Sequence, residues 1–301
     1  MPMIERAGAR IWWETRGHGG TPVLIIQGLG YPSDASWRLL PGLLTRHTVI
    51  VMDNRGAGRS SVPKEQWGVE AMAADAGADA GAVIEAAGLG PAHVIGLSMG
   101  GLIAQELALR SPDLVRSLML GCTSPGGPDA ILLRPDVAEM FNELVALPAE
   151  QAAWRSARVT YSEATPAADI KADIDVRMAR PTSREGYGKQ LMATATFEGT
   201  LARLRDLRLP VLVLHGTSDL IVPVANADTL IHALPQAQLH LMPGAGHIFT
   251  TDATASAVGA MLDFTAECES RVPVGAAPGA SWSHPERAVN DAIAAVAGEA
   301  H

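Results

Sequence analysis

Cysteine is scarce in this chain of 301 residues, and segments for export or membrane insertion are missing. The two cysteines, Cys122 and Cys268, are too few for a disulfide framework, and no C-x-x-C pair suggests a zinc site. The first residues, MPMIERAGAR, contain no apolar stretch typical of a secretory signal. No run reaches the roughly 18 apolar residues that a membrane span needs. We therefore expect a cytoplasmic protein without a metal ion and without a membrane partner.

Positive charge is also in short supply. Lysine and arginine number 23 against 32 aspartates and glutamates, so the net charge is −9 at pH 7. Such a surface repels phosphate backbones, which argues against nucleic acid as a partner. Hydrophobic residues make up 48% of the chain and charged residues 18%, which is enough for a sizeable buried core. The composition favours a folded protein that acts on a small molecule, and it carries no signal for oligomeric state.

Short apolar segments recur along the chain, separated by turn residues. They are typical of strands buried on both faces of a parallel sheet, and they cover residues 22–26, 48–52, 93–96, 115–120, 210–214 and 238–242, with an edge strand over 9–15. Helical patterns lie between them, over residues 36–45, 69–87, 99–110, 223–233 and 252–267. This alternation predicts an α/β fold with a doubly wound, mostly parallel sheet.

One long stretch contains helical patterns and no strand. The patterns cover residues 136–146, 149–160, 167–179 and 183–197. A segment of this length is more than a connector between two strands. We therefore expect a helical cap over residues 124–206, between core segments at 1–123 and 207–270. Residues 271–301 are rich in glycine and proline, which predicts a peripheral tail that is dispensable for chemistry.

The strongest chemical signal is the G-x-S-x-G sequence at residues 96–100. It follows a predicted strand and precedes a predicted helix, which is the setting that a nucleophile elbow requires. Side chains at Gly96 or Gly100 would collide with the backbone of so tight a turn. The turn would lift the Ser98 hydroxyl clear of the sheet at a helix N-terminus, where the helix dipole favours a developing anion. Ser98 is the predicted nucleophile.

A serine hydroxyl needs a base, and the base needs an orienting carboxylate. His247 follows the last predicted strand in a glycine-rich loop that can reach over the sheet, whereas His215 has the setting of a structural turn. Asp219 lies in a loop just after another strand. Asp129 and Asp252 are the alternatives, although Asp252 has the position of a helix N-cap. The order Ser98, Asp219, His247 is that of the α/β-hydrolases.

An oxyanion hole would complete this set. The residue after the nucleophile, Met99, supplies one backbone N–H, and the loop Gln27-Gly-Leu-Gly30 supplies the other, with Leu29 as the best candidate.

Five motifs together make the chain similar to the α/β-hydrolase superfamily over residues 8–267. They are QGLG at 27–30, DNRGAGRS at 53–60, GLSMGG at 96–101, HGTSD at 215–219 and GAGH at 244–247. The resemblance implies the α/β-hydrolase fold with a helical cap inserted after the sixth strand of that fold. The GLSMGG elbow with such a cap resembles the branch that holds enol-lactonases and polyketide-tailoring methylesterases.

The resemblance has consequences for two of these motifs. DNRGAGRS is similar to a structural turn of the family, so Asp53 and Arg55 receive no catalytic role. The family's oxyanion loop usually begins with His-Gly, and Gln27 stands in place of the histidine. The backbone donor survives this change, while the hydrogen bonding of the loop must differ.

These residues predict a serine hydrolase that cleaves a carboxylic ester or lactone through an acyl-enzyme, without a cofactor. Phe141, Trp154 and Tyr187 are candidates for the substrate pocket, together with Tyr161, Met192 and Phe197, although core packing explains each of them equally well. Perhydrolase, lyase or cofactor-free oxygenase chemistry on the same triad is the alternative, and a non-catalytic ligand binder is another. Ser98 argues against dehalogenases and epoxide hydrolases, which use a carboxylate nucleophile.

Overall fold

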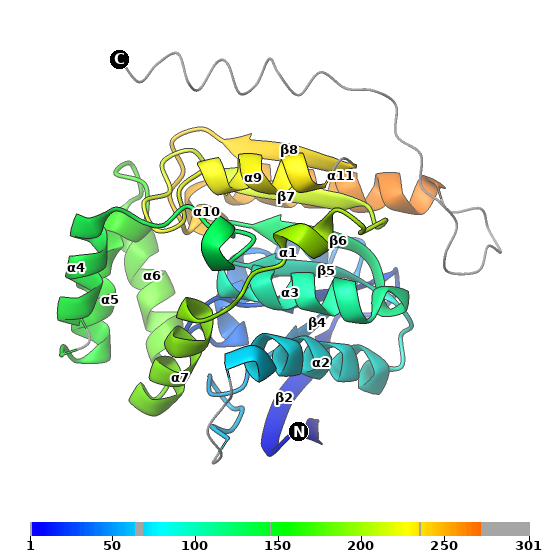
Figure 1. Ribbon diagram of the computed structural model, residues 1–301, viewed down its shortest axis with the longest axis horizontal. Coiled ribbons are helices and arrows are strands. Elements are labelled where there is room, and N and C mark those ends of the chain that lie inside the picture. The colour runs from blue at the N-terminus through cyan, green and yellow to red at the C-terminus, as the bar shows by residue number, and fades with distance from the viewer. Residues whose placement is uncertain (1, 64–68, 145, 235, 272–301) are drawn as a thin grey trace.

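The computed structural model describes residues 2–63, 69–144, 146–234 and 236–271. Its strands form one sheet in the order β1-β2-β4-β3-β5-β6-β7-β8 (Figure 1). The first two strands run antiparallel to their neighbours, and the others are parallel. The strands are β1 Met3–Arg6, β2 Ala9–Arg16, β3 Pro22–Ile26, β4 Thr48–Met52, β5 Ala92–Leu97, β6 Val115–Gly121, β7 Val211–Gly216 and β8 Ala237–Met242. This confirms the predicted doubly wound α/β sheet.

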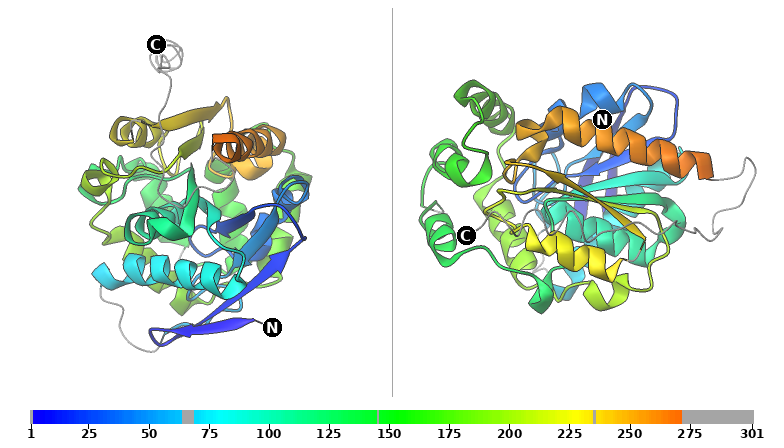
Figure 2. Two further views of the ribbon diagram at one scale, coloured as in Figure 1. Left: turned by 90° about the vertical axis from the view of Figure 1, so that its right-hand side faces the viewer. Right: turned by 90° about the horizontal axis from the view of Figure 1, so that it is seen from above.

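Helices cover both faces of the sheet, as Figure 2 shows. One face carries α2 (Val69–Ala87), α3 (Met99–Arg110) and α9 (Ala225–Ala233), and the other carries α1 (Leu40–Leu43) and α11 (Thr254–Arg271). Alternate strand residues join two separate apolar clusters, so that Leu24 and Ile26 face α2 and α3 while Val23 and Ile25 face α11. Burial on both faces explains why the central strands read as continuous apolar runs.

The described part of the segment between β6 and β7 contains helices and no strand. We call residues 124–206 the insertion. It contains α4 Pro135–Leu144, α5 Ala149–Thr160, α6 Ala167–Met178, α7 Arg184–Ala195 and α8 Leu201–Leu204. In Figure 1, α4 to α7 lie beyond one end of the sheet, on the left of the view. Prolines mark the starts of three of these helices, at positions 135, 148 and 166, where a missing N–H costs nothing.

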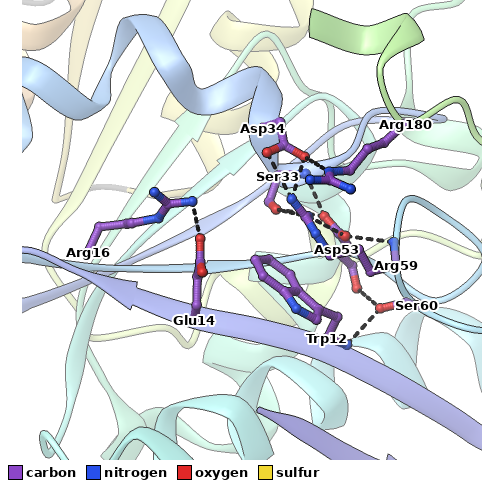
Figure 3. Close-up of polar contacts among 9 residues, drawn as sticks. All are labelled: Trp12, Glu14, Arg16, Ser33, Asp34, Asp53, Arg59, Ser60 and Arg180. Atoms are coloured by element: carbon purple, nitrogen blue, oxygen red, sulfur yellow. Dashed lines mark hydrogen bonds and ion pairs between the residues drawn. The ribbon is translucent and has the colours of Figure 1, made fainter. Parts of the chain in front are cut away.

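An ion-pair network joins the insertion to the core (Figure 3). Asp53 is fully buried and pairs with Arg59, whose Nη2 lies 2.7 Å from Asp34. Arg180 of the insertion reaches the same Asp34 carboxylate, at 3.1 Å. The Arg59 guanidinium also stacks on Trp12, with its carbon 3.8 Å from the ring centroid. The DNRGAGRS segment therefore has a structural position, because its ion pairs connect the core to the insertion.

Three details differ from the sequence-based expectations. Residues 36–45 are a 3-10 helix, Ser33–Arg38, followed by the short α1, because Pro41 favours the first turn of a new helix. The helix expected over 252–267 is divided at Ala253 into α10 (Phe249–Asp252) and α11. Strand β1 was not expected, because its mostly exposed residues show no apolar run. Of the predicted tail at 271–301, Arg271 is the last residue of α11, and residues 272–301 lie outside the described residues. Among the described helices, none is long and apolar enough to cross a bilayer.

Candidate active site

Ser98 lies on the turn between β5 and α3, in a backbone conformation that residues other than glycine rarely adopt. Its φ is 54° and its ψ is −121°. The turn is held by Ser98 N–H, which donates to Gly121 O at 2.9 Å, and by the Thr123 hydroxyl, which donates to Ser98 O at 2.8 Å. So sparsely populated a backbone conformation costs a non-glycine residue about 1–3 kcal/mol, so packing must enforce it. The hydroxyl therefore stands above buried neighbours, at the carboxyl end of the strand.

The glycines on either side of Ser98 are required by close backbone contacts. A Cβ at Gly96 would lie 2.5 Å from Gly100 O, and a Cβ at Gly100 would collide with Ile26 O. A Cβ at Gly101 would lie 2.5 Å from the Thr123 side chain. The clash expected at Gly96 and Gly100 is confirmed.

His247 and Asp219 meet Ser98 in a continuous chain of hydrogen bonds. His247 Nε2 lies 3.0 Å from Ser98 Oγ, and His247 Nδ1 lies 2.8 Å from Asp219 Oδ2. These residues come from three separate strand ends, after β5, β7 and β8. The alternative acid Asp129 is exposed, and Asp252 binds elsewhere, as described below.

The surroundings of Asp219 favour its charged form. Its other oxygen, Oδ1, accepts from the N–H groups of Ile221 and Val222 at 2.8 and 2.9 Å. Burial would raise the pKa of Asp219, but His247 and His215 outweigh it and hold the pKa of this carboxyl below its usual range. An ionised Asp219 fixes the tautomer in which His247 Nε2 is free to accept the Ser98 proton.

The loop that carries His247 is bound on both sides to the insertion. Ile248 N–H donates to Thr160 O at 2.9 Å. Asp252 Oδ2 accepts from the N–H groups of both Gly246 and Ser162, each at 2.8 Å, and Oδ1 accepts from the Thr165 hydroxyl at 2.6 Å. Asp252 is thus a bridge rather than the helix N-cap that its position suggested.

The loop after β3 passes close to the Ser98 side chain. A Cβ at Gly28 would lie 3.2 Å from Ser98 Cβ, so a larger residue there would require Ser98 or the loop to shift by a few tenths of an ångström. Gln27 is buried, its Nε2 donates to Ser36 Oγ at 2.7 Å, and its carbonyl accepts from Asn54 Nδ2 at 2.8 Å. This is how the loop is held without the usual histidine. Within the described residues, no protein group accepts a hydrogen bond from the N–H of Leu29 or Met99.

A cavity of about 570 Å³ opens above Ser98, between the loop after β3 and the insertion. Phe141 and Tyr187, two of the residues that the sequence suggested for the substrate pocket, line this cavity. Trp154 does not, and that expectation is wrong: its side chain is 40% exposed on the opposite side of α5. Tyr161, another sequence candidate, also lines the cavity. Met192 is 62% exposed, and Phe197 is buried away from the cavity.

Sequence reasoning missed two further residues at the cavity wall, Arg177 and Tyr31. The Arg177 guanidinium stacks over the Tyr31 ring, with its carbon 4.4 Å from the centroid. Arg177 lies at a helix position where a charged residue is usually a solvated surface group, so its pattern gave no signal. Among the described residues, no cluster of three or more His, Cys, Asp or Glu could hold a metal ion.

Comparison with known proteins gives a consistent result. The sequence family described as the alpha/beta hydrolase fold matches residues 21–253. The RutD protein of Azorhizobium caulinodans is 29% identical over 255 residues, which cover 83% of this chain and 92% of that protein. The 2-hydroxy-6-oxononadienedioate/2-hydroxy-6-oxononatrienedioate hydrolase of Cupriavidus pinatubonensis is 28% identical over 247 residues, covering 79% and 84%. The enol-lactonase structure from Burkholderia xenovorans LB400 shares the fold, with a TM-score of 0.73 at 21% identity and coverage of 88% and 100%.

Proposed function

Because this chain belongs to the alpha/beta-hydrolase fold family, we propose that it is a serine hydrolase that cleaves a carboxylic ester or lactone through an acyl-enzyme. The observation that carries the proposal is the hydrogen-bonded chain from Ser98 Oγ through His247 to Asp219, with distances of 3.0 and 2.8 Å. Nucleophile, base and orienting acid stand in the order and at the spacing that acyl transfer needs.

The reaction begins when Ser98 Oγ attacks the acyl carbon while its proton moves to His247 Nε2. Asp219 stabilises the resulting imidazolium without taking up the proton. The carbonyl oxygen becomes negative and accepts hydrogen bonds from the N–H groups of Leu29 and Met99. His247 then gives its proton to the leaving alcohol, or to the ring oxygen of a lactone. Water repeats the sequence on the acyl-enzyme and releases the acid.

The insertion is proposed to act as a cap over this site. Two of its residues, Phe141 and Tyr187, line the cavity above Ser98 and would contact the substrate. A volume of about 570 Å³ suits a small organic molecule rather than a polymer. A relative named as a hydrolase of a hydroxy-oxo dioate supports hydrolytic chemistry on such a molecule.

A panel of p-nitrophenyl esters and small lactones tests the proposal. We expect turnover of several substrates by the wild-type protein and essentially none by Ser98→Ala. The alternative, perhydrolase chemistry on the same residues, requires hydrogen peroxide as co-substrate. Activity that appears only with peroxide, or hydrolysis that survives Ser98→Ala, would contradict the proposal.

A further inference from the structure

Arg177 of α6 lies in the wall of the cavity that contains Ser98, and it has no carboxylate partner. Its contacts are to Tyr31: the guanidinium stacks on the ring, and Nη1 is 3.5 Å from the hydroxyl. No aspartate or glutamate in the described ranges reaches this guanidinium at ion-pair distance. Arginine stays charged at any physiological pH, and a charge facing a partly apolar cavity is costly without a counter-charge. The position therefore calls for an anion from outside the protein.

The nearest carboxylate in the cavity wall is already occupied. Asp173 lies one turn before Arg177 on α6, but its Oδ1 binds Arg38 Nε at 2.9 Å and Trp37 Nε1 at 3.1 Å. Its Oδ2 accepts from the Thr251 hydroxyl at 2.6 Å. Asp173 is thus held by Arg38, which also pairs with Asp169 at 3.1 Å, and it forms no ion pair with Arg177.

The charge at Arg177 differs in sign from that of the whole chain. Arg177 lines the cavity, and no aspartate or glutamate among the described residues forms an ion pair with it. The chain as a whole carries a net charge of −9. A local positive charge within an acidic protein concentrates anions at one place.

The neighbouring phenols can add to an anion site. Burial raises the pKa of Tyr187, against the smaller effect of the Arg177 charge, so its hydroxyl stays protonated and able to donate. The Tyr187 ring packs against Gly30, where a Cβ would lie 2.6 Å from ring carbon Cδ2. Arginine and phenol donors together are a common arrangement for binding a carboxylate.

The loop after β3 connects this guanidinium to the nucleophile. A Cβ at Gly28 would lie 3.7 Å from Ser98 Oγ, and a Cβ at Gly30 would lie 3.5 Å from Arg177 Nη2. Gly28 and Gly30 are two positions apart in the chain, so their Cα atoms lie at most about 7 Å from each other. One small molecule can therefore touch both groups at once.

Resting on the proposed function, we propose that Arg177 and Tyr31 bind a carboxylate of the substrate, so that the substrate is an ester or lactone that also bears a free carboxylate. The acyl carbon lies at Ser98 and the carboxylate at Arg177, with a short carbon chain between them. This assigns the substrate class, half-esters and carboxylated lactones, to the cavity.

The test compares two esters that differ only in charge. Mono-p-nitrophenyl glutarate carries a free carboxylate, and its methyl-capped analogue has the same chain without the charge. We expect kcat/KM for the acidic ester to exceed that for the neutral one at least tenfold, despite the net charge of −9. Arg177→Gln should lower this ratio between ten- and hundredfold, mainly through KM, because it removes a charge-assisted hydrogen bond. Arg177→Lys should restore part of the ratio, since it keeps the charge and loses the two-pronged geometry.

Lys171→Gln is the matched control. It removes a positive charge from the same helix, but its side chain is 62% exposed and does not line the cavity. We expect it to leave both activity and ratio unchanged. A wild-type protein that does not discriminate between the esters, or a ratio that persists in Arg177→Gln, would overturn the proposal.

A binding measurement separates this inference from the proposed function. If neither ester is hydrolysed, the proposed function fails, and calorimetry with glutarate decides the carboxylate site by itself. Glutarate binding that weakens at least tenfold in Arg177→Gln, and not in Lys171→Gln, supports the site. No binding by the wild-type protein, or equal binding by Arg177→Gln, overturns it.

Discussion

The sheet with its flanking helices and the insertion are stabilised by different kinds of contact. The sheet buries two large apolar clusters, and none of the described residues from 123 to 200 belongs to either. Polar groups attach residues 123–200 to the rest of the chain, for example Arg180 on Asp34 and Asp173 on Arg38, while Leu204 of α8 joins an apolar cluster of the sheet. The buried apolar core of the sheet fixes the positions of Ser98, His247 and Asp219. The cavity wall depends on individual polar contacts, and a single substitution can remove one of them without disturbing the others. This difference predicts that the core sets the rate and the insertion sets the preference.

One buried amide illustrates how the two regions meet. Gln190 of α7 is 1% exposed, its Oε1 accepts from Gly30 N–H at 2.8 Å, and its Nε2 donates to Arg55 O at 2.9 Å. The insertion thus holds the loop that passes close to Ser98. Hydrogen bonds make this part of the boundary, whereas α8 adds Leu204 to one of the apolar clusters of the sheet.

The largest expected effect lies in the core. Ser98→Ala and His247→Ala should each lower kcat on every ester by a factor of about 10⁴ or more, and the double variant should cost little extra, because the residues act as a unit. Asp219→Asn should cost about as much, since the amide favours the wrong imidazole tautomer. Steady-state kinetics with matched melting temperatures measure these losses. A loss confined to some substrates would contradict the division between core and insertion.

The second largest effect concerns the bridge between the His247 loop and the insertion. Asp252→Ala removes acceptors for Gly246 N–H, Ser162 N–H and the Thr165 hydroxyl. A displacement of His247 by about 1 Å can cost 10²-fold, so we expect kcat to fall by about that factor with little change in KM.

Asp252→Asn provides the conservative comparison. Its amide oxygen can still accept from both N–H groups, and the Thr165 hydroxyl can turn to accept from the amide, so most activity should remain. Asp263→Asn, at an exposed position of α11, controls for loss of a carboxylate. Full activity in Asp252→Ala would show that the insertion does not position the base.

The third effect is on stability and belongs to the core alone. Burial, together with the charge of His47, lowers the pKa of His93 from 6.5 to about 4. The unfolded chain therefore binds more protons between pH 6.5 and 4, and stability falls as the pH falls through that window. Between pH 7 and 5 this histidine should account for a loss of about 2 kcal/mol in the free energy of unfolding.

Urea unfolding at the two pH values measures that loss. His93→Gln can keep the hydrogen bond to Ser117 Oγ, which lies 2.7 Å from His93 Nδ1, and it should flatten the dependence on pH. His232→Gln, at an exposed position of α9, should leave the dependence as it is. An unchanged slope in His93→Gln would refute the role of this buried histidine.

The smallest effect is one of preference. Phe141→Ala enlarges the cavity and should shift the ratio of kcat/KM between long and short acyl chains by about tenfold, with a smaller change on p-nitrophenyl acetate. Trp154→Ala is the natural control, because Trp154 belongs to the insertion but lies outside the cavity wall. Equal losses across all chain lengths in Phe141→Ala would mean that the insertion is scaffolding.

Much of the structure of the core could be predicted, because its tight turns require glycines at fixed spacings that form short sequence motifs. The elbow around Ser98 needs glycines at fixed spacing, and the strand ends place His247 and Asp219 after β-branched, apolar runs. Helices α2 and α3 were expected at the bounds that the structure shows. Strand β1 escaped prediction, because an exposed edge strand needs no apolar pattern.

The cavity wall was harder to predict, since it depends on how helices pack rather than on spacing. The buried face of α5 runs through Ala153, Ser156, Ala157 and Thr160, which places Trp154 on the outer side. This helical period is present in the sequence, so the outward position of Trp154 could have been predicted from it. Arg177 gave no signal, because its lack of a partner depends on Asp173 binding Arg38, a residue 135 positions away.

The most direct test of the central claim is mass spectrometry after treatment with a fluorophosphonate probe. We predict one label per chain, on Ser98, with simultaneous loss of ester hydrolysis and no label in Ser98→Ala. Cys122 also lines the cavity, but burial and the charge of Asp219 raise its pKa, so it should stay an unreactive thiol. A label on another residue, or hydrolysis that continues in the unlabelled protein after treatment, would contradict the assignment of Ser98 as the nucleophile.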